Sequence, residues 1–271
     1  MSERRRLAVL GSPIEHSRSP ALHAAAYRVL ELDWEYGRAE VDTAGLPGFI
    51  AGLGDEWRGL SLTMPLKRDV LPLLDDADEL VTLTGAANTL VLTDGRRRGA
   101  NTDVYGIMRA LAEGGVKGVE SVHLLGGGAT AASALVAVRR LGADRATLAV
   151  RSADRAREAL DLAGRIGLPT EVVALDAAPG PVDLVVSTLP GPAAAGLQVA
   201  AGDGIPLFDV AYDPWPSPLG SRWRGPVISG LEMLLHQAVG QIRLFLTGSA
   251  DEPLPRESEV VAAMRTAVGL P

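Results

Sequence analysis

The middle of the chain alternates short apolar runs with longer segments rich in Ala, Leu and Val. The apolar runs have the length of buried strands, and the segments between them have the length and composition of helices. Such alternation is typical of βα units whose strands form a parallel sheet. The strands predicted in this region cover residues 122–125, 147–150, 171–175, 183–187 and 206–210.

The first part of the chain also alternates, but it contains a hairpin signal. Apolar runs on both sides of Asp94-Gly95 predict two antiparallel strands joined by a two-residue loop. In this register Asn88 pairs with Asn101, so both residues lie at the same end of the hairpin. The other elements expected here are strands at residues 7–10, 34–41 and 58–63 and helices at residues 20–32, 43–53 and 104–112.

The end of the chain changes character. Residues 231–246 predict a long amphipathic helix, and residues 256–268 predict a shorter one. Met233, Gln237 and Gln241 follow one another at a spacing of four on a face beside the apolar stripe. That stripe contains Leu234, Ala238, Ile242 and Phe245. With a length of 271 residues, the pattern predicts an α/β protein of two domains.

A glycine-rich turn follows the first strand of the middle region. Gly126, Gly128 and Ala131 match the G-x-G-x-x-G/A pattern of a dinucleotide-binding βαβ unit. Glycine at 126 permits a tight turn, glycine at 128 lets a pyrophosphate approach, and a small residue at 131 lets helix and strand pack closely. The phosphates would lie on the free N–H groups of the helix start. The alternative is a loop that only turns a corner.

Two arginines follow the next predicted strand. Arg151 stands at its end, where an NAD-specific fold usually carries an acid for the ribose 2′-hydroxyl, and Arg155 is one helical turn further on. Guanidinium groups bind a 2′-phosphate, which a carboxylate would repel. The segment therefore predicts NADP rather than NAD. Asp154, the nearest acid, is expected in the first helical turn and pointing away.

Hydroxyl and ammonium groups follow two strands of the first part. Ser17 and Ser19 flank the start of a helix with Pro20 at its first position. Their hydroxyls either hold an anion there or only cap the turn. Thr63 and Lys67 share one face if the chain between them stays extended, which would place a hydroxyl beside an ammonium.

Three further polar residues are candidates for ligand contacts. Asp103 lies at the same end of the hairpin as Asn88, and it also suits the N-cap of the following helix. Tyr212 follows a strand of the parallel sheet, at an edge where ligands bind in such folds. Gln237 either donates to a substrate hydroxyl or is a polar residue at the helix boundary.

Composition narrows the classes of partner. With a net charge of −7, the chain is not expected to have the basic surface with which nucleic-acid-binding proteins displace counterions. The absence of cysteine excludes disulfides, thiolate metal ligands and thiol nucleophiles, and the four histidines show no metal-ligand spacing. No apolar stretch has the length of a signal-peptide core or a membrane span. We therefore expect a cytoplasmic protein that binds no nucleic acid, membrane or metal.

Together these segments resemble the shikimate dehydrogenase family over essentially the full length of the chain. Each motif alone is modest, but their joint order and spacing are specific. Besides the glycine turn, the motifs are Gly11-x-Pro13-x-x-His16-Ser17-x-Ser19-Pro20, Thr63-x-Pro65-x-Lys67, Ala87-Asn88-Thr89, Asn101-Thr102-Asp103, Tyr212-x-Pro214 and Gly230-x-x-Met233-x-x-x-Gln237-Ala238.

The resemblance implies an activity and a division of labour. The family reduces 3-dehydroshikimate to shikimate with NADPH in aromatic amino-acid biosynthesis. It implies a substrate-binding α/β domain of residues 1–103 and 231–271, with the C-terminal helices packing back on it. It implies a Rossmann-like NADP-binding domain of residues 104–230. We expect a monomer or a homodimer.

The resemblance also implies roles for individual residues. Lys67 and Asp103 match the catalytic pair of the family. Ser17, Ser19 and Tyr212 match residues that bind the substrate carboxylate, and Thr63, Asn88 and Gln237, with the catalytic pair, match residues that hold the ring hydroxyls. The expected cofactor-binding residues are Gly126, Gly127, Gly128, Ala129, Thr130, Ala131, Arg151, Ser152, Arg155, Thr188, Leu189, Val210, Gly230 and Met233.

Two departures from the family pattern stand in the cofactor segments. Gly127 and Ala129 replace the second and fourth residues of the usual G-A-G-G-A, at positions that vary in the fingerprint. The family's N-R-T becomes Val150-Arg151-Ser152, which removes one adenosine-ribose contact but keeps the arginine. Two alternatives remain: a dehydrogenase that also uses quinate, and a non-catalytic sensor of shikimate-pathway metabolites.

Overall fold

Two β-sheets organise the chain, each inside its own compact unit. The computed structural model describes residues 4–197, 199 and 204–271. One unit comprises Met1–Thr102 and Leu234–Pro271, and the other comprises Asp103–Met233. The first unit is therefore assembled from both ends of the sequence, and the second from its middle.

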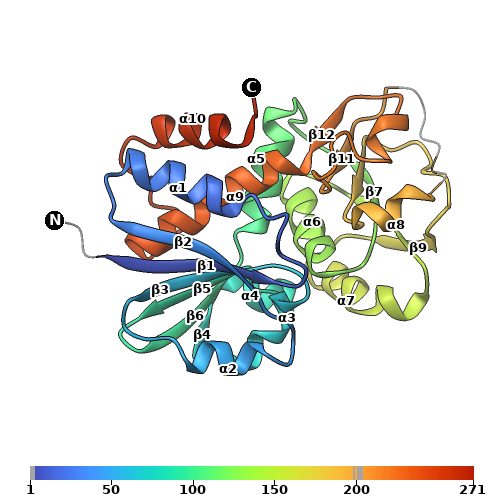
Figure 1. Ribbon diagram of the computed structural model, residues 1–271. Coiled ribbons are helices and arrows are strands. Elements are labelled where there is room, and N and C mark those ends of the chain that lie inside the picture. The colour runs from blue at the N-terminus through green and yellow to red at the C-terminus, as the bar shows by residue number, and fades with distance from the viewer. Residues whose placement is uncertain (1–3, 198, 200–203) are drawn as a thin grey trace. The chain divides into compact units, whose positions relative to one another are not determined.

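The first unit contains a mixed six-stranded sheet (Figure 1). Its strands are β1 (Arg5–Gly11), β2 (Trp34–Glu40), β3 (Trp57–Leu62), β4 (Asp76–Ala77), β5 (Thr89–Thr93) and β6 (Arg96–Ala100). They lie in the order β2-β1-β3-β5-β6-β4. β1 is parallel to β2 and β3, whereas β5 is antiparallel to β3 and β6. Thr89 pairs with Ala100 and Thr93 with Arg96, which confirms the register expected for the hairpin.

Helices cover both faces of this sheet, as Figure 1 shows. They are α1 (Ser19–Val29), α2 (Leu46–Ala51), α3 (Leu66–Asp69), α4 (Glu79–Thr84), the 3₁₀ turn η1 (Leu71–Leu73), α10 (Glu257–Val268) and most of α9 (Gly230–Thr247). α1, α9 and α10 pack on one face, and α2, α3 and α4 pack on the other. The C-terminal helices thus pack on the N-terminal sheet, as the resemblance implied.

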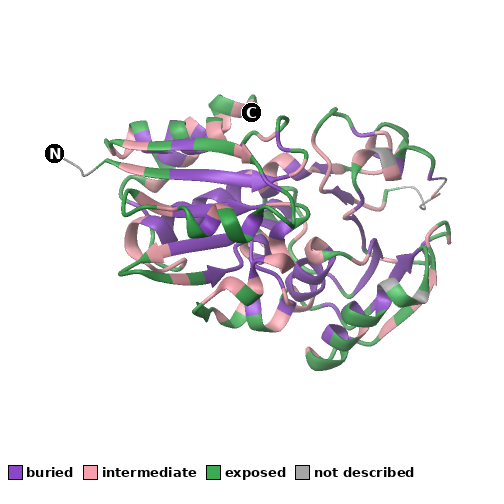
Figure 2. Ribbon diagram, turned by 60° about the horizontal axis from the view of Figure 1, so that its bottom comes forward, coloured by how far each residue is buried: buried purple, intermediate pink, exposed green. Residues whose placement is uncertain are grey.

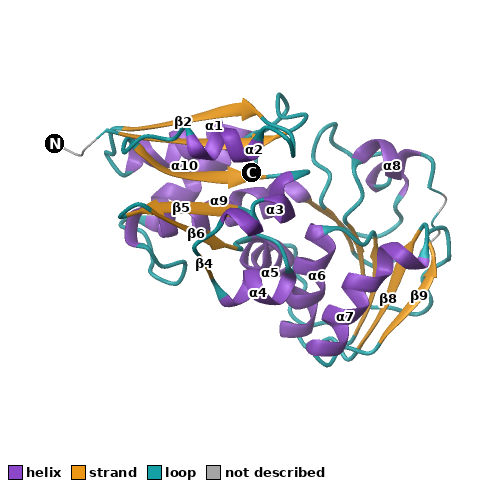
Figure 3. Ribbon diagram, turned by 90° about the horizontal axis from the view of Figure 1, so that it is seen from below, coloured by secondary structure: helices purple, strands orange, loops and turns teal. Residues whose placement is uncertain are grey.

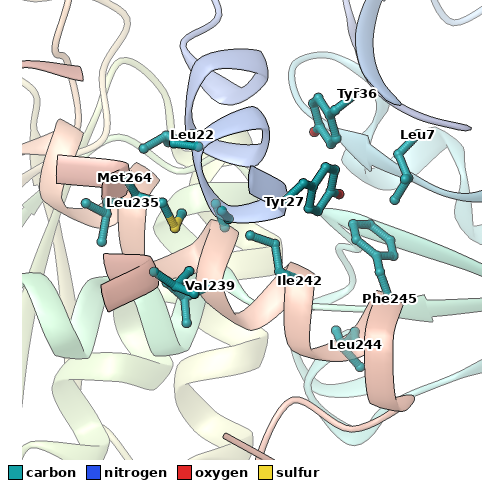
Figure 4. Packing of buried hydrophobic residues seen from close by; sticks show 14 of the residues in the cluster. Leu7, Leu22, Tyr27, Tyr36, Leu235, Val239, Ile242, Leu244, Phe245 and Met264 are labelled. Carbon is teal, nitrogen blue, oxygen red and sulfur yellow. The ribbon is translucent and has the colours of Figure 1, made fainter. Parts of the chain in front are cut away.

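The core beneath α9 is aromatic at one end (Figure 4). Tyr27 and Tyr36 lie close to Phe245 there, and all three side chains are buried. α10 is fastened to α9 by an ion pair in which Arg243 Nη2 lies 2.5 Å from Glu257 Oε1. The predicted apolar stripe of α9 is confirmed, since it faces this core.

The second unit contains a six-stranded sheet in which every neighbouring pair is parallel. Its strands are β7 (Ser121–Leu125), β8 (Arg145–Val150), β9 (Thr170–Ala174), β10 (Leu184–Ser187), β11 (Leu207–Asp209) and β12 (Val227–Ser229), in the order β12-β11-β10-β7-β8-β9. The expected α/β class and parallel sheet are confirmed. β12 is an additional strand, and with three residues it is too short for a periodic pattern.

Helices also cover this sheet on both faces (Figure 3). They are α5 (Asp103–Glu113), α6 (Ala129–Arg140), α7 (Arg157–Arg165) and α8 (Gly191–Ala195), with 3₁₀ turns η2 (Ala153–Ala156) and η3 (Gly220–Arg222). α6 contacts α5 and α7, while Ala194 of α8 packs with Leu125 and Val185 of the sheet. Figure 2 shows buried residues along the strands. No helix among the described residues is long and apolar enough to cross a membrane.

The chain between Thr63 and Lys67 does not stay extended, so the predicted shared face is wrong. β3 ends at Leu62, and the Leu66 N–H then donates to the Thr63 carbonyl. Lys67 lies in α3. A turn and a helix replace the strand geometry, and an alternating pattern does not apply to them.

Two helix starts also differ from the prediction. Ser19 is the first residue of α1 and Arg18 its N-cap, so Pro20 occupies the second position. The helix expected at 43–53 is only α2, because the Asp42 carboxylate first accepts the N–H of Gly45 in a turn. α3, α4 and α8 were not predicted, because segments of four to six residues give little periodic signal.

His23 of α1 gives the stability of the first unit a pH dependence. Its ring is fully buried, it lies 3.8 Å from the Tyr36 ring in a stacked arrangement, and its Nδ1 is 3.0 Å from the Tyr27 hydroxyl. Burial lowers the pKa of His23 to about 3. Between that value and 6.5 the unfolded chain binds a proton that the folded protein excludes.

We predict that His23→Gln removes part of the loss of stability on acidification. The native pKa is lower than the unfolded one, so the free energy of unfolding falls as pH drops below 6.5, by about 1.4 kcal/mol per pH unit. Denaturant titrations at pH 7 and pH 5 measure the difference. His123→Gln makes the same test in the second unit, because burial also lowers the pKa of His123, to about 4. If His23→Gln loses as much stability between pH 7 and pH 5 as the wild-type protein, the prediction is contradicted.

Candidate functional site

A cluster of buried amide and hydroxyl groups lies where the hairpin of the first unit meets α9. Asn88 Nδ2 donates to Thr102 Oγ1 at 2.8 Å and to Gln237 Oε1 at 3.1 Å. Asn88 Oδ1 accepts the Thr102 N–H at 2.9 Å. The structure therefore brings together two of the predicted substrate-binding residues, Asn88 and Gln237, which are 149 positions apart.

Asn101 holds the end of the hairpin in place. Its Nδ2 donates to Thr84 Oγ1 and to the Ala86 carbonyl, both at 3.0 Å. Its N–H donates to Asp78, whose carboxylate also caps α4. Burial raises the pKa of Asp78, and these backbone N–H donors oppose the shift.

The two predicted serines lie at the start of α1. Ser17 Oγ accepts the N–H of Ser19 at 3.3 Å, so one hydroxyl already closes the turn. Ser17 is partly exposed, whereas Ser19 is buried. The loop before them is fastened to the loop after β3, because the Ser12 N–H donates to the Met64 carbonyl. The Ser17 and Thr63 segments are therefore neighbours.

The backbone carbonyl of Lys67 fastens α3 to a neighbouring segment. The Ala87 N–H donates to the Lys67 carbonyl at 2.8 Å, which joins α3 to the segment that carries Asn88. Lys67 and Thr63 are both partly exposed. An ammonium and a hydroxyl thus lie on segments directly bonded to the Asn88 cluster.

Three polar residues of the same region escaped the site prediction. Tyr36 of β2, Ser61 of β3 and Gln241 of α9 are buried and bonded to one another. Two signals pointed to them. Ser61 is the lone hydroxyl between Leu60 and Leu62 in a buried strand, and Gln241 follows Gln237 by one helical turn.

The glycine turn of the second unit has the predicted strand–turn–helix form. Gly126 has φ +106°, and a Cβ there would come within 2.6 Å of Thr188 Oγ1, so only glycine fits. Gly128 is exposed, and a Cβ on it would meet no atom within 4 Å. It is the N-cap of α6 but offers no side-chain acceptor. The first N–H groups of α6 therefore remain suited to phosphate.

The other residues expected near the cofactor form two groups. Thr188 is fastened to the turn, since its N–H and its hydroxyl both donate to the Leu125 carbonyl. Leu189 lies beside Gly126, where its Cδ2 would be 3.3 Å from an added Cβ. A Cβ at Gly230 would lie 2.0 Å from the Val210 carbonyl oxygen, so glycine is required for that approach. The remaining residues of these groups are Gly127, Ala129, Thr130, Ala131 and Met233, of which Ala131 and Met233 are buried.

Arg151 and Ser152 follow β8 directly and are exposed. Asp154 lies in η2 and forms an ion pair with Arg157, at 2.9 Å, so its carboxylate is in the predicted helical turn and is held by another arginine. The side chain of Arg155 lies outside the described part of the chain. Arg151 is thus a guanidinium at the carboxyl end of a parallel strand.

Tyr212 lies in a loop that is fastened by a buried acid. Ser217 Oγ donates to Asp209 Oδ2 at 2.5 Å, and the Ala211 N–H donates to Asp209 Oδ1 at 3.2 Å. Burial raises the pKa of Asp209, and these hydrogen bonds oppose the shift. The acid thereby fixes the segment on which the partly exposed Tyr212 stands.

Asp103 is the first residue of α5 and belongs to the second unit. Its side chain is buried. Because it already lies inside the helix, it does not occupy the N-cap position that the sequence also allowed.

These observations fit a dinucleotide in the second unit. A strand, a positive-φ glycine, an open second glycine and an uncapped helix start occur in sequence, with Arg151 after the next strand. The positive end of α6 suits a pyrophosphate, and the guanidinium suits a 2′-phosphate.

Comparisons with known proteins point to one family. Residues 9–90 match the model of the shikimate dehydrogenase substrate binding domain. The chain is 34% identical to the shikimate dehydrogenase (NADP(+)) of Methanothermobacter thermautotrophicus, over 91% of this chain and 92% of that protein. It is similar to the crystal structure of shikimate dehydrogenase from Mycobacterium tuberculosis, with 40% identity, a TM-score of 0.83 and coverage of 97% and 99% of the two chains.

A third relative was solved with ligands. The shikimate 5-dehydrogenase of Thermus thermophilus, in complex with NADP(H) and shikimate, is 31% identical with a TM-score of 0.80, and the match covers 97% of this chain and 99% of that one. The resemblance inferred from the motifs is confirmed by these near full-length matches. The chain belongs to the shikimate dehydrogenase family.

Proposed function

We propose that this protein catalyses the reversible reduction of 3-dehydroshikimate to shikimate with NADPH, a step of aromatic amino-acid biosynthesis. It is an oxidoreductase that acts on a CH–OH group and uses NADP. The observation that carries the proposal is the cluster of Asn88, Thr102 and Gln237 beside the Lys67 segment. It gathers several neutral hydrogen-bonding groups near one ammonium, which suits a small polyhydroxylated ring with a ketone.

The chemistry of reduction assigns the ammonium a role. The nicotinamide, when bound, supplies the hydride. Reduction builds negative charge on the ketone oxygen, which the Lys67 ammonium stabilises before it donates a proton from Nζ. Asp103 holds a neighbouring hydroxyl and orients the lysine. Family membership and the placement of Lys67 next to the Asn88 segment support this assignment.

The remaining residues bind the two ligands. Ser17, Ser19 and Tyr212 bind the substrate carboxylate, and Thr63, Asn88 and Gln237 hold its ring hydroxyls. We assign substrate binding to residues 1–103 and 231–271 and NADP binding to residues 104–230. The match of residues 9–90 to a substrate-binding domain and the geometry of the glycine turn support this division.

Cofactor contacts follow the same division. The glycine turn and the start of α6 hold the pyrophosphate, and Arg151, Ser152 and Arg155 hold the 2′-phosphate end. Thr188, Leu189, Val210, Gly230 and Met233 contact the rest of the cofactor. Their support is the close packing of Thr188 against Gly126 and of Gly230 against Val210.

Two expectations concern the cellular state. The supply of NADPH inside cells supports a cytoplasmic location. A monomer or homodimer stays a prediction.

An assay with two substrates and two cofactors tests the proposal. We expect shikimate to drive NADP⁺ reduction, followed by the absorbance of the reduced nicotinamide, and NAD⁺ to react more slowly. Comparable turnover of quinate would show the broader dehydrogenase. Binding of shikimate in calorimetry without any turnover would show a sensor and refute the proposed activity.

We predict that Lys67→Ala lowers kcat by about 10²–10⁴-fold, the range typical of a lost general acid. The KM for shikimate changes much less, because other groups bind the substrate. Steady-state kinetics measure both constants. Lys117→Ala is the control, since Lys117 is the other lysine of the chain and is exposed in the second unit. A kcat for Lys67→Ala near that of the control would refute the role.

We predict that Arg151→Ala raises the KM for NADPH roughly tenfold, the equivalent of a lost charged hydrogen bond, and changes the KM for NADH little. NADH lacks the phosphate that this guanidinium pairs with. The control is Arg140→Ala. This exposed arginine is the last residue of α6, at the end opposite to the proposed pyrophosphate site. Equal effects on the two cofactors would show that the 2′-phosphate is recognised elsewhere.

A further inference from the structure

A continuous row of hydrogen bonds crosses the interior of the first unit. The Tyr36 hydroxyl donates to Ser61 Oγ at 2.6 Å, and the Ser61 hydroxyl donates to Gln241 Oε1 at 2.8 Å. Gln241 Nε2 then donates to the Asn88 carbonyl and to Thr89 Oγ1, both at 3.0 Å. All five residues are buried, so water does not substitute for these partners.

The row fixes the orientation of the Asn88 amide. The Thr89 hydroxyl donates to Asn88 Oδ1 at 2.9 Å, and the Thr102 N–H donates to the same oxygen. With its oxygen facing two donors, the amide presents Nδ2 to Gln237 and to Thr102 Oγ1. A reversed amide would set its NH₂ group against the Thr102 N–H.

The other end of the row is the Tyr36 hydroxyl, inside the aromatic cluster of the first unit. Burial raises the pKa of Tyr36, and the side-chain hydrogen bond with Ser61 opposes the shift. The row therefore links β2, β3 and α9 to Asn88, proposed for a ring hydroxyl.

We propose that Tyr36, Ser61 and Gln241 are positioning residues that hold the Asn88 amide in the orientation that a ring hydroxyl of the substrate requires. This inference rests on the proposed function. A site gains affinity when its hydrogen-bonding groups are already oriented before the ligand binds. The three residues act through Asn88 and need no contact with the substrate.

A comparison of two tyrosines separates positioning from stability. Tyr36→Phe removes the hydroxyl at the start of the row and keeps the ring that stacks on His23. Tyr27→Phe is the matched control, because this buried hydroxyl pairs with His23 Nδ1. Both variants lose one buried hydroxyl from the same aromatic cluster, and we expect similar decreases in Tm.

The expected result is a split in kinetic constants. Tyr36→Phe raises the KM for shikimate roughly 3- to 10-fold, the equivalent of one hydrogen bond. Its kcat and its KM for NADP⁺ stay near the wild-type values, and Tyr27→Phe leaves all three constants near wild type. An unchanged KM for shikimate in Tyr36→Phe, or an equal rise in both variants, overturns the inference.

A second variant tests the same row in case Tyr36→Phe does not fold. Ser61→Ala interrupts the same row one bond further on with a smaller change in volume. We expect it to raise the KM for shikimate as Tyr36→Phe does, and the double variant to show less than the product of the two effects, since both break one connection. Fully multiplicative effects refute a common row. Absence of shikimate turnover in the wild-type enzyme refutes the proposed function, and this inference with it.

Discussion

The side chain of Asn88 is almost completely excluded from water, and several segments of the first unit supply the hydrogen-bond partners of its amide. A buried amide without partners costs free energy comparable to several ordinary contacts. Its partners come from the hairpin, from the segment that precedes α5 and from α9. These segments must all be in place before the amide is satisfied, which ties a functional group to the folding of the whole unit.

The same requirement explains why both ends of the chain build one unit. α9 brings Gln237 and Gln241 to the hairpin, and Phe245 of the same helix packs where Gly59 leaves room on β3. The ion pair of Arg243 with Glu257 then fastens α10 beside it. The polar face of α9 thus holds the geometry of the proposed ligand site, and its apolar face packs in the core. The second unit, in contrast, is built from consecutive βα segments of the middle of the chain.

Local signals predicted some parts of the molecule well. The Asp94-Gly95 loop gave the hairpin register because a two-residue turn leaves one pairing. Gly126 and Arg151 were found because a backbone angle and a strand end each demand a particular residue type. The extended form of 63–67 was wrong, because a turn and α3 follow β3 there. β12, α3 and α4 were missed because they are too short to show a period.

The sequence by itself determined the class of fold, the glycine turn, the hairpin and, through its motifs, the family. Each of these depends on neighbours along the chain or on a pattern of residue types. Only the tertiary structure decided that Tyr36, Ser61 and Gln241 form one row of hydrogen bonds that ends at Asn88, since their partners are separated by up to 180 positions. A hydrogen bond between buried side chains depends on where distant segments meet, and no local period encodes that meeting.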